Sequence, residues 1–195
     1  MEGNWLKLSN ERDEHGKHFV LSNDGTTTFG RMESDSGLPD VPIKLSEGVI
    51  TNPATKEGYG LVHIEARHGD QIRNAGFATV VDFVEEVAKN YEVIREGTNR
   101  DGNQTYLLQL TDKNNNTLMV ELSGDETYWN INTAGVFRTS YGAKNKVVYD
   151  RHATEKQSAE TAEASLSGEQ NGTTPSTSMN ASIQQNILSE GKDSK

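Results

Sequence analysis

The spacing of apolar residues changes at Tyr91, and this change constrains the fold more than any other feature of the sequence. Before Tyr91, Val80, Val84 and Val87 recur at the 3.6-residue period of an amphipathic helix. This helix would begin at Thr79, because a Thr-x-x-Asp pattern is a variant of the capping box. After Tyr91, apolar and polar residues alternate with the two-residue period of a strand. Helices and strands in separate stretches are typical of an α+β fold.

Short polar turns separate the strands expected after Tyr91, so successive strands should be antiparallel neighbours. The sequence therefore predicts helices packed on a four- to five-stranded antiparallel β-meander that follows them in the chain. One face of this meander is apolar and should face the long helix, whereas the other is polar. The predicted inner face holds Tyr106, Leu108, Leu110, Leu118, Val120, Leu122, Trp129 and Ile131, and the outer face holds Gln109, Glu121, Tyr128, Asn130 and Asn132.

The composition of the chain divides it into three parts. Residues 1–42 form an N-terminal lead-in, in which Asn23-Asp24-Gly25 predicts a small β-hairpin between segments 19–22 and 26–29. Residues 43–150 hold the main domain. Residues 151–195 have no aromatic residue and few apolar ones, so we expect a disordered tail, with 157–166 as a candidate short helix.

Charge and residue usage exclude several classes of function. The 195-residue chain has no cysteine, which rules out disulfides and thiolate metal sites. It shows neither a signal peptide nor an apolar run long enough to span a membrane, so we expect a cytoplasmic protein, with delivery to a target cell as a further option. The net charge is −10, and residues 48–150 carry ten basic and fourteen acidic groups. This balance disfavours broad nucleic-acid coating but leaves room for a local basic cleft.

The segment from His63 to Gly69 holds the first candidate functional residues. If it is helical, His63 and Arg67 share one face, His68 lies at the edge of the buried stripe, and Gly69 ends the helix. A histidine that exchanges protons near neutral pH beside a guanidinium suits work on an anionic group. A surface helix with scattered polar residues is the simpler alternative. The histidines lack partners at zinc spacing, so we expect no metal and no cofactor.

A second candidate region is the polar face of the meander. Asn130 and Asn132 lie on this face, and the segment 138–141 follows with an arginine and three hydroxyl side chains. Arg95, at a strand end, could extend over the same cleft. The alternative is again simple, because antiparallel sheets commonly expose one polar face to water without any function.

Five segments of the main domain are distinctive when they are taken together: His63–Gly69, Phe83-Val84, Ile94–Gly97, Tyr128–Gly135 and Arg138–Tyr141. Together they resemble a known nuclease group, the phage-associated branch of the barnase/EndoU/colicin/RelE-like (BECR) fold. This fold is found as terminal modules of phage, conjugative-element and polymorphic-toxin proteins. The resemblance covers roughly residues 43–150 and implies a helical portion packed on a four-stranded antiparallel sheet, with metal-independent cleavage of RNA.

Such cleavage implies specific roles for the residues that carry the resemblance. A base takes the proton of the ribose 2′-OH, an acid protonates the leaving 5′ oxygen, and cationic donors stabilise the phosphoryl charge. Either His63 or His68 could be base or acid. The expected catalytic residues are His63, Arg67, His68, Ser140 and Tyr141, and the expected substrate-binding residues are Arg95, Asn130, Asn132, Arg138 and Thr139.

The resemblance also implies partners: an RNA substrate and a cognate immunity protein as a candidate, with neither DNA nor a membrane expected. Two other functions remain open. One is a non-catalytic interaction module of a mobile-element polyprotein, which a scattered set of site residues would favour. The other is an acidic antidote or nucleic-acid mimic, which predicts a contiguous carboxylate face formed by Asp82, Glu85 and Glu86.

Overall fold

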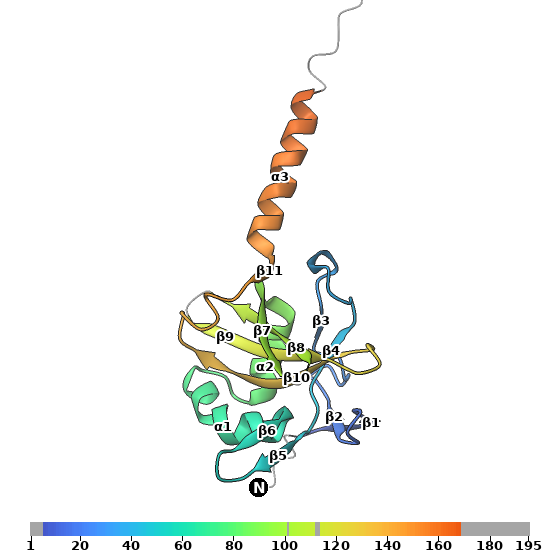
Figure 1. Ribbon diagram of the computed structural model, residues 1–195, viewed down its shortest axis with the longest axis vertical. Helices are drawn as coiled ribbons and strands as arrows, with labels where there is room; N and C mark the ends of the chain where they lie inside the picture. Colours follow the sequence, from blue (N-terminus) through green and yellow to red (C-terminus); the bar gives the residue numbers. More distant parts are fainter. Residues whose placement is uncertain (1–5, 101, 112–113, 169–195) are drawn as a thin grey trace, which may run out of the picture. The chain divides into compact units, whose positions relative to one another are not determined.

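The computed structural model describes residues 6–100, 102–111 and 114–168 (Figure 1). The chain divides into two compact units, 1–156 and 157–195. The first unit contains the sheet, the two core helices and every predicted site residue. It also includes most of the expected lead-in, because Phe19, Val20 and Phe29 are buried in the core.

A seven-stranded mixed sheet organises the first unit, with the strand order β11-β7-β8-β9-β10-β4-β3. Strands β7 to β10 are the antiparallel neighbours expected from the alternating pattern. The predicted four- to five-stranded antiparallel meander is nevertheless wrong, because the sheet is larger and mixed. A parallel strand, β4, pairs with β10 at one edge and carries β3 beyond it. The strands are β3 (Gly30–Arg31), β4 (Pro42–Lys44), β7 (Val93–Arg100), β8 (Asn103–Leu110), β9 (Asn115–Leu122), β10 (Trp129–Phe137) and β11 (Val147–Asp150).

The prediction that the helices come before the strands of the main sheet is also wrong, because β3 and β4 precede α1. The predicted hairpin does not form either: its Asn23-Asp24-Gly25 turn exists, but β2 pairs with β1 rather than with the segment after the turn. A further hairpin, β5–β6, directly precedes α1. These elements are β1 (Leu8–Arg12), β2 (His18–Val20), a 3-10 turn (Ser34–Ser36), β5 (Val49–Asn52) and β6 (Glu57–Tyr59).

Helix α1 spans Gly60–Asn74 and therefore continues through Gly69, which was expected to end it. A glycine can remain in a helix interior when neighbouring contacts compensate for its weak helix propensity. Here the Glu65 carboxylate and the Arg73 guanidinium lie 2.9 Å apart on either side of Gly69, along one face of the helix. An added Cβ at Gly69 would collide with both side chains, so the ion pair uses the space that glycine leaves.

Helix α2 (Val80–Asn90) confirms the capping-box prediction, because Thr79 and Asp82 bond each other's backbone N–H. Its apolar stripe is buried, as expected, against the sheet face that holds Leu108, Leu118 and Val120, each fully buried. The opposite side of α2 is not the continuous solvated carboxylate face that a nucleic-acid mimic would present. Glu85 is buried there and binds the Lys89 ammonium at 2.6 Å.

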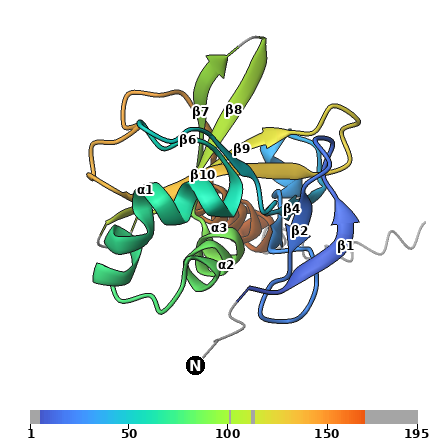
Figure 2. The ribbon, with the colours of Figure 1, turned by 90° about the horizontal axis from the view of Figure 1, so that it is seen from below.

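Helix α1 lies along the half of β10 that β4 leaves without a partner strand (Figure 2). β4 pairs only with Trp129 and Asn130, so the rest of that edge would have unpaired backbone groups. The Gln71 side-chain amide donates to the Val136 carbonyl and satisfies one of them. This placement brings the histidines of α1 next to the second half of β10.

Helix α3 spans Arg151–Gly168. The disorder expected from residue 151 onward is therefore wrong for this stretch, and the helix predicted at 157–166 lies inside α3. The remainder of the expected tail, 169–195, lies outside the described residues. In the part of the chain that is described, no helix combines the length and apolar character needed to cross a membrane.

Candidate functional site

Four aromatic rings form a continuous row that joins α1 to the end of β10. The ring centroids of His63 and His68 are 6.2 Å apart, and those of His68 and Phe137 are 5.6 Å apart, both with edge-to-face geometry. Phe137 stacks on Tyr141 with centroids 4.3 Å apart and an interplanar angle of 15°. The row brings together three of the five expected catalytic residues from segments about 70 positions apart in the sequence. We call it the ring row.

His63 is the buried end of the ring row, with 5% of its surface exposed. Its Nδ1 lies 2.7 Å from the Lys56 carbonyl oxygen, and its Nε2 lies 3.1 Å from Thr133 Oγ1. Since a carbonyl only accepts, Nδ1 carries a proton and donates it to Lys56, while Nε2 shares a hydrogen bond with the Thr133 hydroxyl. Both nitrogens are therefore engaged inside the protein, which suits a residue that positions its neighbours better than one that exchanges protons with a substrate.

His68 lies half-buried in the middle of the row. Burial lowers the pKa of its imidazole below the ordinary 6.5, and the charges of Arg67 and His63 act in the same direction, against a hydrogen bond with Gln71. The ring is therefore neutral near pH 7 and able to accept a proton. Gly135 makes room for it, because a Cβ there would lie only 3.2 Å from the imidazole.

Exposed polar side chains flank the ring row at both ends. Arg67 precedes His68 in α1, and Arg138, Thr139 and Ser140 follow β10. None of the ion pairs found among the described residues involves Arg67 or Arg138. In an acidic protein, two guanidinium groups that no described carboxylate pairs with are available to an anionic ligand.

The segment from Arg138 to Lys146, which we call the 138–146 turn, carries four of the expected site residues, from Arg138 to Tyr141. β10 ends at Phe137, and the chain then forms successive turns. Backbone N–H groups of Tyr141, Ala143 and Asn145 each bond the carbonyl three residues earlier. Burial raises the pKa of the Tyr141 hydroxyl above 10.0, so this group is protonated at neutral pH.

Arg95 does not extend freely over the cleft. Its Nε donates to Gln109 Oε1 at 3.1 Å, and its Nη1 donates to the Asn145 carbonyl at 3.2 Å. The guanidinium is thus held between the sheet and the 138–146 turn. Its position suits a structural role better than the substrate-binding role expected from the sequence.

Asn130 and Asn132 belong to a chain of hydrogen-bonded polar side chains near the start of β10. Ser46 Oγ lies 3.0 Å from Asn130 Oδ1, and Asn130 Nδ2 lies 3.4 Å from Asn132 Oδ1. Asn132 Nδ2 then donates to Glu121 Oε2 at 2.7 Å. Asn132 is the extra residue where the β9–β10 register shifts. The two asparagines are therefore bound to each other and to the sheet, and neither belongs to the ring row.

Sequence reasoning missed several residues that build the site. Thr133 bonds Nε2 of His63, Phe137 contacts both His68 and Tyr141, and Gln71 bonds both His68 and the β10 edge. Only Gln71 carried a usable signal, since it lies three residues after His68 and so on the same helix face. Thr133 and Phe137 could not be assigned because the register shift in β10 changes the alternation of its side chains.

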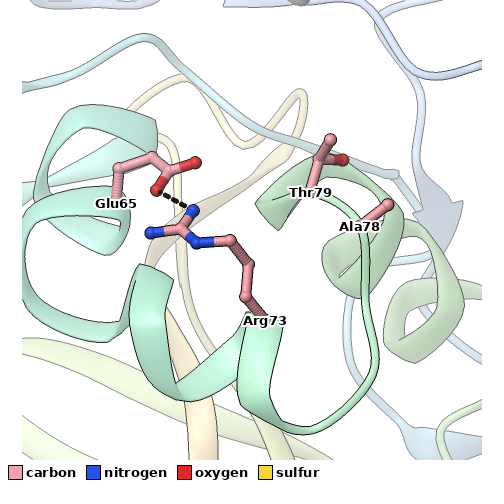
Figure 3. A pocket seen from close by; sticks show the side chains of 4 residues that line it. All are labelled: Glu65, Arg73, Ala78 and Thr79. Atoms are coloured by element: carbon pink, nitrogen blue, oxygen red, sulfur yellow. Dashed lines mark hydrogen bonds and ion pairs between the residues drawn. The ribbon is translucent and has the colours of Figure 1, made fainter.

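A pocket lined by Glu65, Arg73, Ala78 and Thr79 lies between α1 and the start of α2 (Figure 3). Arg73 points into it but is paired with Glu65 and with Asp70, each at 2.9 Å. The charge in this pocket is therefore balanced internally. None of the expected site residues lines it, so we place the candidate site at the ring row.

Among the described residues, no three His, Asp or Glu side chains gather closely enough to hold a metal ion. The chemistry open to the ring row is proton transfer beside cationic donors. Comparisons of the chain with protein-family models, with curated proteins and with solved structures found no match.

Proposed function

We propose that the protein is a metal-independent endoribonuclease that cleaves RNA by attack of the ribose 2′-OH on the adjacent phosphorus. The observation that carries the proposal is the contact of Phe137 with both His68 and Tyr141. It brings a neutral imidazole and a protonated phenol into contact with the same ring. The resemblance of the sequence to BECR nucleases supports the same activity, and we propose on that ground that the chain is a module of a mobile-element or toxin protein.

The two groups suit the two proton transfers of transesterification. His68 takes the 2′-OH proton, O2′ forms a bond to phosphorus, and the bond from phosphorus to O5′ breaks. Tyr141 gives its proton to the departing O5′, and the His68 imidazolium then restores the phenol through water. The products are a 2′,3′-cyclic phosphate and a 5′-hydroxyl, with no net change in protons.

The remaining site residues stabilise charge rather than move protons. Arg67 and Arg138 offer guanidinium groups to the phosphoryl oxygens, and Ser140 offers a hydroxyl. His63 acts from inside the protein: its edge-to-face contact fixes the His68 ring. The burial that raises the Tyr141 pKa also makes the phenol a weak acid, so slow turnover is expected.

The proposal is tested with a DNA oligonucleotide that contains one ribonucleotide, incubated with the purified full chain in EDTA. We expect a single cut at the ribonucleotide, with a 2′,3′-cyclic phosphate identified by mass spectrometry. A 2′-O-methyl group at that position removes the nucleophile and should abolish cleavage. His68→Gln should lower the rate about 10²- to 10⁴-fold, the usual contribution of general acid–base catalysis.

His152→Gln is the matched control, because His152 is exposed and lies at the start of α3, outside the ring row. It should leave the rate unchanged. Wild-type protein that cleaves no RNA at high concentration, or His68→Gln with full activity, would refute the proposal. An inactive but folded wild type would instead support a non-catalytic binding module.

A further inference from the structure

Three side chains from the outer face of the sheet hold the 138–146 turn in place. The first is Asn115, at the start of β9, with 5% of its surface exposed. Its Nδ2 lies 3.3, 3.1 and 3.0 Å from the carbonyl oxygens of Arg138, Thr139 and Tyr141. Because all three partners are acceptors, the orientation of the amide is defined, and its donors converge on the segment that carries Ser140 and Tyr141.

Gln109 is the second contact, with 1% of its surface exposed. Its Nε2 lies 3.3 Å from the Tyr141 carbonyl and 3.1 Å from Thr117 Oγ1, while its Oε1 accepts from Arg95. Arg95 is the third, since it donates onward to the Asn145 carbonyl. Four carbonyls of an irregular segment thus receive donors from sheet side chains, which satisfies backbone groups that no strand or helix could pair.

Gly142 shows how closely the turn approaches the sheet. Its φ is +70°, in the left-handed region, and a Cβ there would lie 2.9 Å from Leu107 Cδ1. Glycine is the residue that adopts this backbone conformation without strain. The turn therefore rests directly on β8, at a height set by the amides of Asn115 and Gln109.

We infer that Asn115 and Gln109 are positioning residues for the cleavage reaction, an inference that rests on the proposed function. Both are too deeply buried to touch RNA. They act through the backbone of the 138–146 turn, whose placement sets the Tyr141 ring against Phe137 and holds Ser140 beside the site. A displacement of about 1 Å at reacting groups can cost about 100-fold in rate.

The first test uses Asn115→Asp, which keeps the shape of the side chain but replaces the donor with a carboxylate facing three carbonyls. Asn114→Asp is its matched control, the same change at an exposed neighbouring residue. Hydrogen–deuterium exchange is read at the amides of Tyr141, Ala143 and Asn145. We expect exchange to rise about tenfold or more in Asn115→Asp, the change that a loss of about 1.4 kcal/mol in local stability produces, and not in Asn114→Asp.

The second test uses Gln109→Glu, which removes the donor to Tyr141 but keeps an acceptor for Arg95, so the fold should survive. Cleavage of the single-ribonucleotide substrate should show a fall in kcat of about 10- to 100-fold, with KM changed far less. A purely structural role would lower the melting temperature and leave the kcat of the folded protein unchanged.

The outcomes separate the two proposals. Faster exchange together with lower kcat supports the positioning role. Unchanged exchange in Asn115→Asp, or faster exchange with unchanged kcat, overturns it. If wild type cleaves no RNA, the proposed function fails with the catalytic part of this inference, whereas the exchange data still decide whether Asn115 holds the turn.

Discussion

The two faces of the sheet are buried to a similar degree by opposite means. On the inner face Leu108, Leu118 and Val120 are fully buried and pack against α2. On the outer face Gln109 and Thr117 are 1% exposed, although both are polar. Apolar contact is non-directional and tolerates many arrangements, whereas a buried amide is stable only where its hydrogen bonds are met. The inner face therefore provides stability, and the outer face defines one conformation of the segment above it.

The largest effect should come from the inner face. Leu118→Ala removes a fully buried side chain and should lower the free energy of unfolding by about 2–5 kcal/mol, measured by urea denaturation. Met119→Ala, the next residue on the outer face, is partly exposed and should cost clearly less. An equal loss for the two variants would contradict the division between the faces.

His63 and His68 allow a second comparison between a structural and an accessible residue. Both ring nitrogens of His63 are hydrogen-bonded inside the protein, whereas His68 is only half-buried. His63→Phe leaves the Lys56 carbonyl and the Thr133 hydroxyl without a partner and should cost about 1–3 kcal/mol in unfolding free energy. His68→Phe should cost less than about 1 kcal/mol but abolish RNA cleavage. The reverse order of stabilities would show that His63 is not the structural member of the pair.

A smaller effect is expected where the outer face uses a single hydrogen bond. Ser46→Ala removes the buried hydroxyl that lies 3.0 Å from Asn130 Oδ1 and should cost about 1 kcal/mol by chemical denaturation. Ser34→Ala, an exposed serine in the 3-10 turn, provides the control and should change stability by less than about 0.5 kcal/mol. Equal effects would mean that the Asn130–Asn132 chain contributes nothing measurable.

The smallest effect is the pH dependence contributed by His68. Its pKa is lowered on folding, so the unfolded state binds the proton more tightly. The contribution of the neutral ring is complete above pH 6.5 and is lost as the pH falls through the folded-state pKa. Wild type should therefore lose more stability than His68→Gln between pH 7.5 and pH 5, as followed by melting temperature. Parallel pH profiles for the two proteins would exclude this linkage.

Local patterns in the sequence determined the middle of the fold. The capping box at Thr79, the apolar stripe of α2 and the alternation in β8 and β9 each depend on residues a few positions apart. Such signals survive folding because the same neighbours remain in contact. They also assigned Leu108, Leu118 and Val120 to the buried face of the sheet. His68 and Tyr141, which the sequence singled out as candidates, contact the same ring in the ring row.

Only the tertiary structure decided the rest, since it depends on contacts between distant segments. The three residues of β4 carry too little pattern to predict a parallel strand beside β10, and the β1–β2 pairing replaced an equally reasonable local hairpin. The same holds for the site. His63 is hydrogen-bonded to Thr133, 70 residues away, and Arg95 is hydrogen-bonded to the carbonyl of Asn145, 50 residues away. The sequence determines which chemical groups a side chain carries, but the folded structure determines which partners it bonds, because those partners come from distant segments.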